Sequence, residues 1–210
     1  MNKKSFSALI SASILGLSLS TSANANLLVN GGFEDQTGTA QGVNTGWSYY
    51  LAADVPGWDG SNIELWTGLT PSAYEGSYHA ELNAHPQTSG AWSIYQTFTT
   101  IVGQTYDVFF AYSARNGDSS ASDEEFTVAF NGTTFTLNDH VVGSWRTFSQ
   151  SFIATGLTTT LTFTSVVPLE GTLGNFIDDV RVNVPEPSAV ALLGLGLLGL
   201  GVARKRNKRA

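Results

Sequence analysis

Aromatic and polar side chains alternate through residues 47–74 in a pattern suited to holding a sugar. The aromatic members are Trp47, Tyr49, Tyr50, Trp58, Trp66 and Tyr74, and Asp54, Asp59, Asn62 and Glu64 lie between them. Sugar rings stack their C–H faces on aromatic rings, and their hydroxyls need planar donors and acceptors. This pattern predicts glycan contacts by Trp47, Trp58, Trp66 and Tyr74. The alternative is that these aromatics fill a core, with Trp58 closing the end of a sheet.

Alternation along residues 78–83 indicates a second polar surface. The Tyr, Ala and Leu of this stretch would face a core, so His79, Glu81 and Asn83 would point to the outer face of the same strand. Gln96 can join them from a neighbouring strand. We therefore add His79, Glu81 and Gln96 to the predicted glycan ligands. The alternative is a set of exposed polar strand positions without a ligand.

Motifs for catalysis are missing from the sequence. Glycoside hydrolysis needs two carboxylates, but with 17 acidic residues some pair can always be proposed. Gly-x-Ser-x-Gly, His-Glu-x-x-His and a phosphate-binding glycine loop do not occur. The three histidines show no persuasive metal spacing, although His79 and His85 with Glu81 form a weak candidate. We predict no catalytic residue and no enzyme.

Asp178 is a carboxylate that strand alternation places toward the core, on the face of Val180 and Val182. A carboxylate pointing inward must be paired, neutralised or bound to a metal ion. The sequence leaves two alternative partners for Asp178: a metal ion, or a set of backbone N–H groups.

The same alternation predicts the elements that position these residues. Tyr106, Val108, Phe110 and Tyr112 face one way, and residues 92–99, 126–130, 135–137, 145–154, 161–163 and 180–184 are also strand-like. Asn131-Gly132 is a strong hairpin signal. About eight to ten short strands with polar turns are typical of an all-β fold, here an antiparallel two-sheet β-sandwich.

Both ends of the chain carry targeting patterns. Residues 1–25 predict a signal peptide, because Lys3 and Lys4 precede a short apolar run and Ala23-Asn24-Ala25 suits signal peptidase. At the other end, residues 184–210 contain Pro185-Glu186-Pro187, an apolar run over 189–203 and a basic cluster. The apolar run is shorter than the ~18 residues of a stable spanning helix, which favours a temporary anchor over a permanent one. The basic cluster would stay in the cytoplasm.

This C-terminal order of motifs resembles the PEP-CTERM sorting signal read by exosortases. The resemblance implies processing near Pro185-Glu186-Pro187 after transient inner-membrane insertion. It also implies an exported protein of the cell surface or extracellular matrix and a link to exopolysaccharide or biofilm.

The charge of the intervening domain narrows the choice of partners. Residues 26–187 hold all 17 acidic residues but only Arg115, Arg146 and Arg181 as basic residues, a net charge of −14. Such a surface argues against nucleic acid and favours cations. The chain has no cysteine, which removes disulfides and thiolate metal sites.

The domain, residues 26–183, resembles the galactose-binding-like jelly-roll family, which includes many carbohydrate-binding modules. The resemblance lies in 26-NLLVNGGFE-34, 75-EGSYHAELN-83, 94-IYQTF-98 and 176-FIDDVRV-182. It implies a jelly-roll fold and a structural calcium ion, with Glu34, Asp178 and Asp179 as ligands. If they share an ion, a chelator should lower the melting temperature.

Three functions therefore compete. The first is non-catalytic binding of exopolysaccharide, the second is a structural matrix protein or adhesin without a defined glycan, and the third is a glycoside hydrolase. We favour them in that order.

Overall fold

The computed structural model describes residues 25–68, 71–86, 92–115, 124–169 and 171–185. Ala23, Glu186, Pro187 and the apolar run of the tail lie outside these residues. No helix in the described ranges is long and apolar enough to cross a membrane. The elements are β1 (Gly42–Asn44), β2 (Trp47–Tyr50), the 3-10 helix η1 (Ala52–Asp54), β3 (Asp59–Gly60), β4 (Ile63–Trp66), β5 (His79–Glu81), β6 (Ser93–Thr99), β7 (Thr105–Ser113), β8 (Glu125–Phe130), β9 (Thr133–Leu137), β10 (Arg146–Ile153), β11 (Thr158–Val167) and β12 (Phe176–Asn183).

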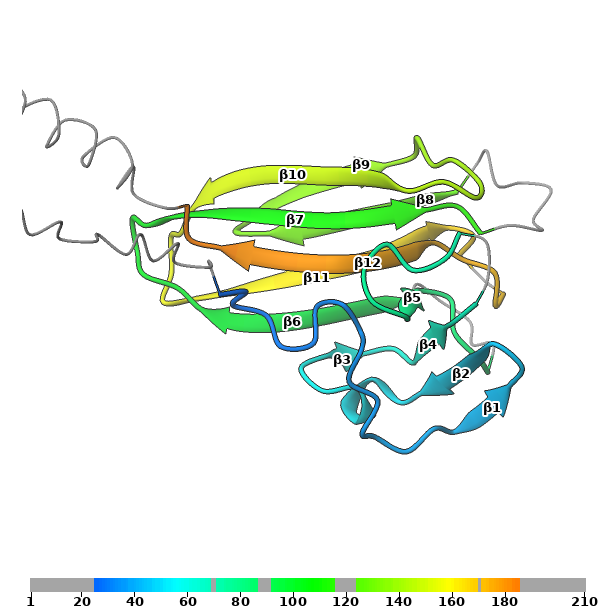
Figure 1. The fold of residues 1–210 in the computed structure, drawn as a ribbon. Coiled ribbons are helices and arrows are strands. Elements are labelled where there is room, and N and C mark those ends of the chain that lie inside the picture. The colour runs from blue at the N-terminus through cyan, green and yellow to red at the C-terminus, as the bar shows by residue number, and fades with distance from the viewer. Residues whose placement is uncertain (1–24, 69–70, 87–91, 116–123, 170, 186–210) are drawn as a thin grey trace, which may run out of the picture.

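These strands form two antiparallel sheets that pack face to face (Figure 1). Sheet A has the order β1-β2-β4-β5-β12-β7-β10, and sheet B has the order β3-β6-β11-β8-β9. From β5 onward the chain crosses repeatedly between the sheets, so that β5-β12-β7-β10 lies opposite β6-β11-β8-β9. This nested pair of Greek keys is a jelly roll. The predicted all-β jelly-roll sandwich is therefore confirmed.

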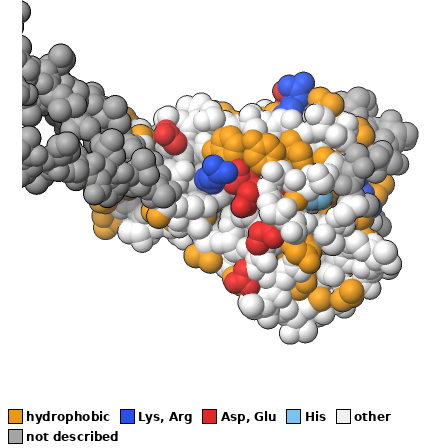
Figure 2. All heavy atoms as spheres, viewed as in Figure 1, with side chains coloured by type: hydrophobic (Ala, Val, Ile, Leu, Met, Phe, Trp, Pro, Cys, Tyr) orange, Lys and Arg blue, Asp and Glu red, His pale blue; other side chains and the backbone are white. Residues whose placement is uncertain are grey.

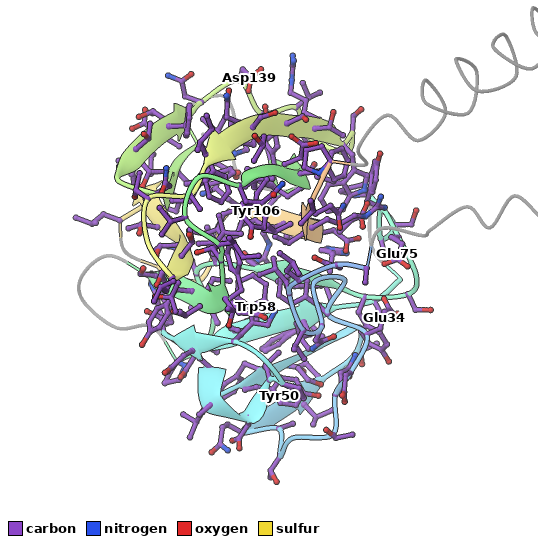
Figure 3. All side chains as sticks on the ribbon, turned by 90° about the vertical axis from the view of Figure 1, so that its left-hand side faces the viewer. Glu34, Tyr50, Trp58, Glu75, Tyr106 and Asp139 are labelled. Atoms are coloured by element: carbon purple, nitrogen blue, oxygen red, sulfur yellow. The ribbon has the colours of Figure 1, made fainter. Side chains whose placement is uncertain are left out.

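The core between the sheets is built from the alternating apolar positions of the sequence. Phe110 of β7 meets Phe163 of β11 edge to face, with ring centroids 4.9 Å apart. Figure 3 looks along the strands and shows Tyr106 and Trp58 between the two sheets. The predicted Asn131-Gly132 hairpin joins β8 to β9, and both residues have the positive φ angles that such a turn requires.

A β-bulge in β12 corrects the expectation for Asp178. Ile177, Val180 and Val182 belong to the core, whereas Asp178 lies opposite Ala111 of β7, on the outer face of sheet A. The register shifts between Asp178 and Arg181, and Asp179 adopts a φ of 52°. The extra residue reverses the alternation. The prediction that Asp178 shares a face with Val180 is wrong for this reason.

Candidate functional site

An aromatic strip lies on the outer face of sheet A. Its members are Tyr74, Phe109 and Trp145, which come from the loop before β5, from β7 and from the residue that precedes β10. Tyr74 is 6.4 Å from Phe109 and 6.1 Å from Trp145 between ring centroids. Tyr74 is 44% exposed, and the other two rings are half-buried. The Trp145 indole donates a hydrogen bond of 2.8 Å to the Ser72 carbonyl, which fixes the ring against the loop.

A polar cleft of about 540 Å³ lies beside this strip. It is lined by Asn26, Gly32, Glu75, Asp179, Val180, Arg181 and Asn183. Arg181 connects the two features, because its guanidinium lies 5.3 Å from the Phe109 ring centroid and its Nε donates to Asp179 Oδ1 at 2.6 Å. The Asn183 Oδ1 atom is buried without a hydrogen-bond partner among the described residues. On the face turned to the viewer, Figure 2 shows a band of hydrophobic side chains bordered by acidic and basic groups.

The N-terminal segment forms one wall of the cleft by docking on the bulge of β12. Asn26 donates to the Val180 carbonyl and accepts from the Val182 N–H, at 2.8 and 2.9 Å. The Gly31 carbonyl accepts from the Val180 N–H at 2.9 Å. A Cβ atom at residue 31 would collide with the Val180 carbonyl, so this approach requires glycine. The bulge and the glycine together shape the cleft.

Two of the predicted calcium ligands hold the loop that forms the other wall. Asp178 Oδ2 accepts from the N–H groups of Tyr74 and Glu75 at 2.7 and 3.0 Å. Glu34 Oε1 accepts from the N–H groups of Ser77 and Tyr78, each at 2.8 Å. Figure 3 shows Glu34 and Glu75 on the same side of the sandwich. The carboxylates therefore position the loop that presents Tyr74.

The three carboxylates predicted to bind calcium already have other partners in this structure. Calcium takes six to eight oxygen ligands. Asp178 and Glu34 already accept backbone N–H groups, and Asp179 pairs with Arg181. The described residues contain no group of three His, Cys, Asp or Glu side chains that could hold a metal. Burial raises the pKa of Asp178 to about 7, while its backbone hydrogen bonds oppose this rise.

A second group of predicted residues lies on the same face of sheet A but is covered by loops. Glu81 accepts two bonds from Arg115, at 2.8 and 3.0 Å, one from the Trp66 indole at 2.6 Å and one from the Gly174 N–H at 2.6 Å. Arg115 also lies 4.7 Å above the Trp66 ring and donates to the Thr172 carbonyl at 2.7 Å. Glu81 thus joins β4, β5 and two connecting segments.

Glu64 lies directly opposite Glu81 in the sheet and has its own partner. Glu64 Oε2 is 2.8 Å from His85 Nδ1, and the His85 ring stacks on Trp47 with centroids 4.6 Å apart. Burial raises the pKa of Glu81 above its usual range, Arg115 opposes this effect, and Glu64 adds to it. Both carboxylates are fully buried, and Glu81 accepts four hydrogen bonds from three nitrogen atoms, those of Arg115, Trp66 and Gly174. The pair therefore holds the segments that cover this part of sheet A.

His79 is buried between Phe176 and Trp145, with ring centroids 4.6 and 5.5 Å away. Neither ring nitrogen has a hydrogen-bond partner among the described residues. Burial lowers the pKa of His79 to about 4. His79 lies on the outer face of sheet A, as the sequence pattern predicts. Its ring is buried instead of exposed, because Trp145 of the aromatic strip covers it.

We expect His79 to make the domain less stable as the pH falls from 6.5 to 4. Between these pH values His79 is protonated in the unfolded chain but stays neutral in the folded protein. The free energy of unfolding therefore drops by about 1.4 kcal/mol per pH unit. Urea denaturation of the wild type and His79→Phe at pH 7, 5.5 and 4 tests this. The variant should lose less stability between pH 7 and pH 4. Asp178 acts in the opposite direction in both proteins, and parallel pH profiles would contradict the prediction.

Two other predicted glycan ligands, Trp58 and Gln96, are buried inside the domain. Trp58 is 3% exposed, stacks on Phe33 at 5.1 Å and donates its indole N–H to the Asn30 carbonyl. Gln96 binds the Val29 N–H at 2.6 Å and the Val29 carbonyl at 3.0 Å through its amide. With no open ring face, Trp58 takes the core role that was its alternative. We leave both residues out of the candidate site.

The sequence did not predict eight residues of the strip and the cleft: Asn26, Gly32, Glu75, Phe109, Trp145, Val180, Arg181 and Asn183. Phe109, Trp145, Arg181 and Asn183 come from strands or strand ends remote in sequence. Phe109 could have been found from the sequence, because it is an aromatic residue at an outward position between the core residues Val108 and Phe110. Arg181 could also have been found, because it is one of only three basic residues in the domain.

The sequence matches two protein-family models. Residues 26–183 match the family described as "Protein of unknown function (DUF642)", and residues 183–206 match the PEP-CTERM protein-sorting motif. The sorting motif indicates an exported, surface-associated protein. No curated protein matches the chain at a significant level.

Solved structures with a similar fold include three carbohydrate-binding modules. A CBM61 module in complex with β-1,4-galactotriose is 18% identical with a TM-score of 0.46, covering 75% of this chain and 97% of that chain. A CBM4 structure is 17% identical with a TM-score of 0.45, covering 74% and 98%. A CBM35 from Paenibacillus barcinonensis is 22% identical with a TM-score of 0.41, covering 64% and 97%. Similarities at this level assign no function.

Proposed function

The chain belongs to the DUF642 family and carries a PEP-CTERM sorting motif, and we propose that it is a non-catalytic glycan-binding protein of the cell surface or extracellular matrix. The observation that carries this proposal is the aromatic strip beside a polar cleft on the outer face of sheet A. A binding site of this kind combines ring faces with a few fixed polar groups.

Each part of the site has a role that suits a sugar. Tyr74 and Trp145 offer apolar ring surface to sugar C–H faces. Arg181 and Asn183 offer polar groups for hydroxyls, and Glu75 offers an acceptor on the loop that forms the other wall. The N–H bonds to Glu34 and Asp178 hold the loop in place before a ligand arrives. Such preorganisation reduces the entropy lost on binding.

The proposed route to the surface uses both ends of the chain. Signal peptidase removes residues 1–25, and the C-terminal tail halts in the inner membrane. An exosortase then processes the chain near Pro185-Glu186-Pro187 and releases or reattaches the domain. The acidic domain would encounter exopolysaccharide outside the cell, where its net charge of −14 favours solubility.

Isothermal titration with the producing cell's exopolysaccharide tests the proposal directly. We expect binding heat that saturates, with and without added calcium. A panel of unrelated neutral and anionic polysaccharides serves as the control for specificity. If no polysaccharide gives heat under either condition, the structural matrix or adhesin function replaces the glycan-binding one.

A further inference from the structure

One end of the sandwich is formed by three loops and by the end of β12. The loops are residues 100–104, 131–132 and 154–157, and we call this surface the tail-side end because Val184 and Pro185 leave the domain there. Thr100 N–H donates to the Leu157 carbonyl at 2.9 Å, and Gly103 N–H donates to the Ala154 carbonyl at 2.8 Å. In Figure 1 the strands β6, β10 and β12 all end at this side, which faces the viewer in Figure 3.

The tail-side end exposes large apolar side chains. Leu157 is 73% exposed and Ile101 is 67% exposed, and Val102 and Ile153 are each more than half exposed. Asn131 holds the loops together, because it accepts from the Thr155 hydroxyl at 2.9 Å and donates to the Ile153 carbonyl at 2.9 Å. The apolar residues are therefore presented by an ordered, hydrogen-bonded surface.

The same end carries no charge in any of its three loops. This is unusual because residues 26–187 together hold 17 acidic residues and carry a net charge of −14. Carboxylates near an anionic lipid surface would repel it. A neutral apolar end can approach such a surface without that penalty.

We propose that the tail-side end docks on the lipid bilayer that holds the sorting tail. This inference rests on the membrane stage of the proposed function. The apolar run of the tail begins at residue 189, four residues after Pro185, and four residues span at most about 14 Å. An inserted tail therefore keeps the tail-side end next to the outer surface of the membrane. Ile101, Val102 and Leu157 would enter the interface, where apolar side chains gain from leaving water.

This docking is reversible, because it depends on the tail that tethers the domain to the membrane. A few apolar side chains give weak membrane affinity alone, but a short tether raises their effective concentration at the bilayer. Once the tail is removed, that contribution disappears and the acidic domain leaves the surface. While docked, the domain also holds Val184 and Pro185 close to the membrane surface.

The absence of cysteine allows a direct test with single labelled positions. The full chain carrying Leu157→Cys is labelled with an environment-sensitive fluorophore and reconstituted through its tail into phosphatidylethanolamine–phosphatidylglycerol vesicles. We expect a blue-shifted emission that lipid-borne quenchers reduce. Val43→Cys is the matched control, since Val43 is an exposed apolar residue (76%) on β1, at the outer edge of sheet A. Its probe should stay in water.

The possible outcomes separate docking from anchoring. Vesicle flotation with equal, water-like emission at positions 157 and 43 overturns docking and leaves membrane anchoring intact. Failure of the full chain to float overturns both. Shielding of position 157 that vanishes when the protein is diluted into excess lipid identifies a second copy as the occupant, and this also overturns the proposal.

Discussion

Replacing Glu81 with alanine is expected to lower the free energy of unfolding by roughly 3–5 kcal/mol, a large share of the ~5–15 kcal/mol typical of a domain. The carboxylate is fully buried and accepts four N–H bonds. Its removal leaves the Arg115 guanidinium mostly buried without its counter-charge and frees the Trp66 indole and the Gly174 N–H. Urea denaturation monitored by tryptophan fluorescence measures the loss.

Arg146→Ala is the matched control, because it breaks an ion pair with Asp139 in which both side chains are about half exposed. Such pairs contribute about 0–1 kcal/mol. A double variant, Glu81→Leu with Arg115→Met, should recover most of the stability that Glu81→Ala loses, since no buried charge remains unpaired. A loss for Glu81→Ala as small as that for Arg146→Ala would contradict the account of the covered cluster.

Removing the aromatic strip is expected to weaken glycan binding at least tenfold, about 1.4 kcal/mol. Tyr74→Ala and Trp145→Ala each delete ring surface beside the cleft, and a few aromatic residues commonly carry most of the energy of a binding site. Titration of each variant with the exopolysaccharide that the wild type binds gives the change in affinity. The melting temperature of each variant shows that the domain is still folded.

Tyr95→Ala provides the comparison for a lost aromatic ring. Tyr95 is a partly exposed residue of β6, and its hydroxyl donates to Asp59 on the outer face of sheet B. We expect this variant to bind like the wild type. Equal losses for Tyr95→Ala and Trp145→Ala would show that the effect does not come from the proposed surface.

Local signals were sufficient to predict much of the fold. Alternation placed Val108 and Phe110 in the core, and the Asn131-Gly132 dipeptide placed the β8–β9 hairpin. The outward position of His79 and Glu81 also follows from period-two alternation, with Ala80 buried between them. These features depend on neighbours in the sequence, which is why they are readable from it.

Features that depend on distant partners were not readable. The bulge at Asp179 reverses the face of Asp178, and nothing in 176-FIDDVRV-182 marks the extra residue. The burial of Glu81 depends on Arg115, 34 residues away, and on a loop 93 residues away. Likewise Tyr74, Phe109 and Trp145 become neighbours only when the sandwich closes. The sequence therefore could not predict which of its aromatic residues share one surface.

Amide hydrogen exchange tests most directly whether the outer face of sheet A is the glycan contact surface. The mature protein is compared with and without its saturating exopolysaccharide. We expect added protection in residues 72–75, 144–147 and 179–183, and unchanged exchange in β6 and β11 of sheet B. Protection confined to sheet B, or no change at the strip and cleft under saturating ligand, would contradict the account.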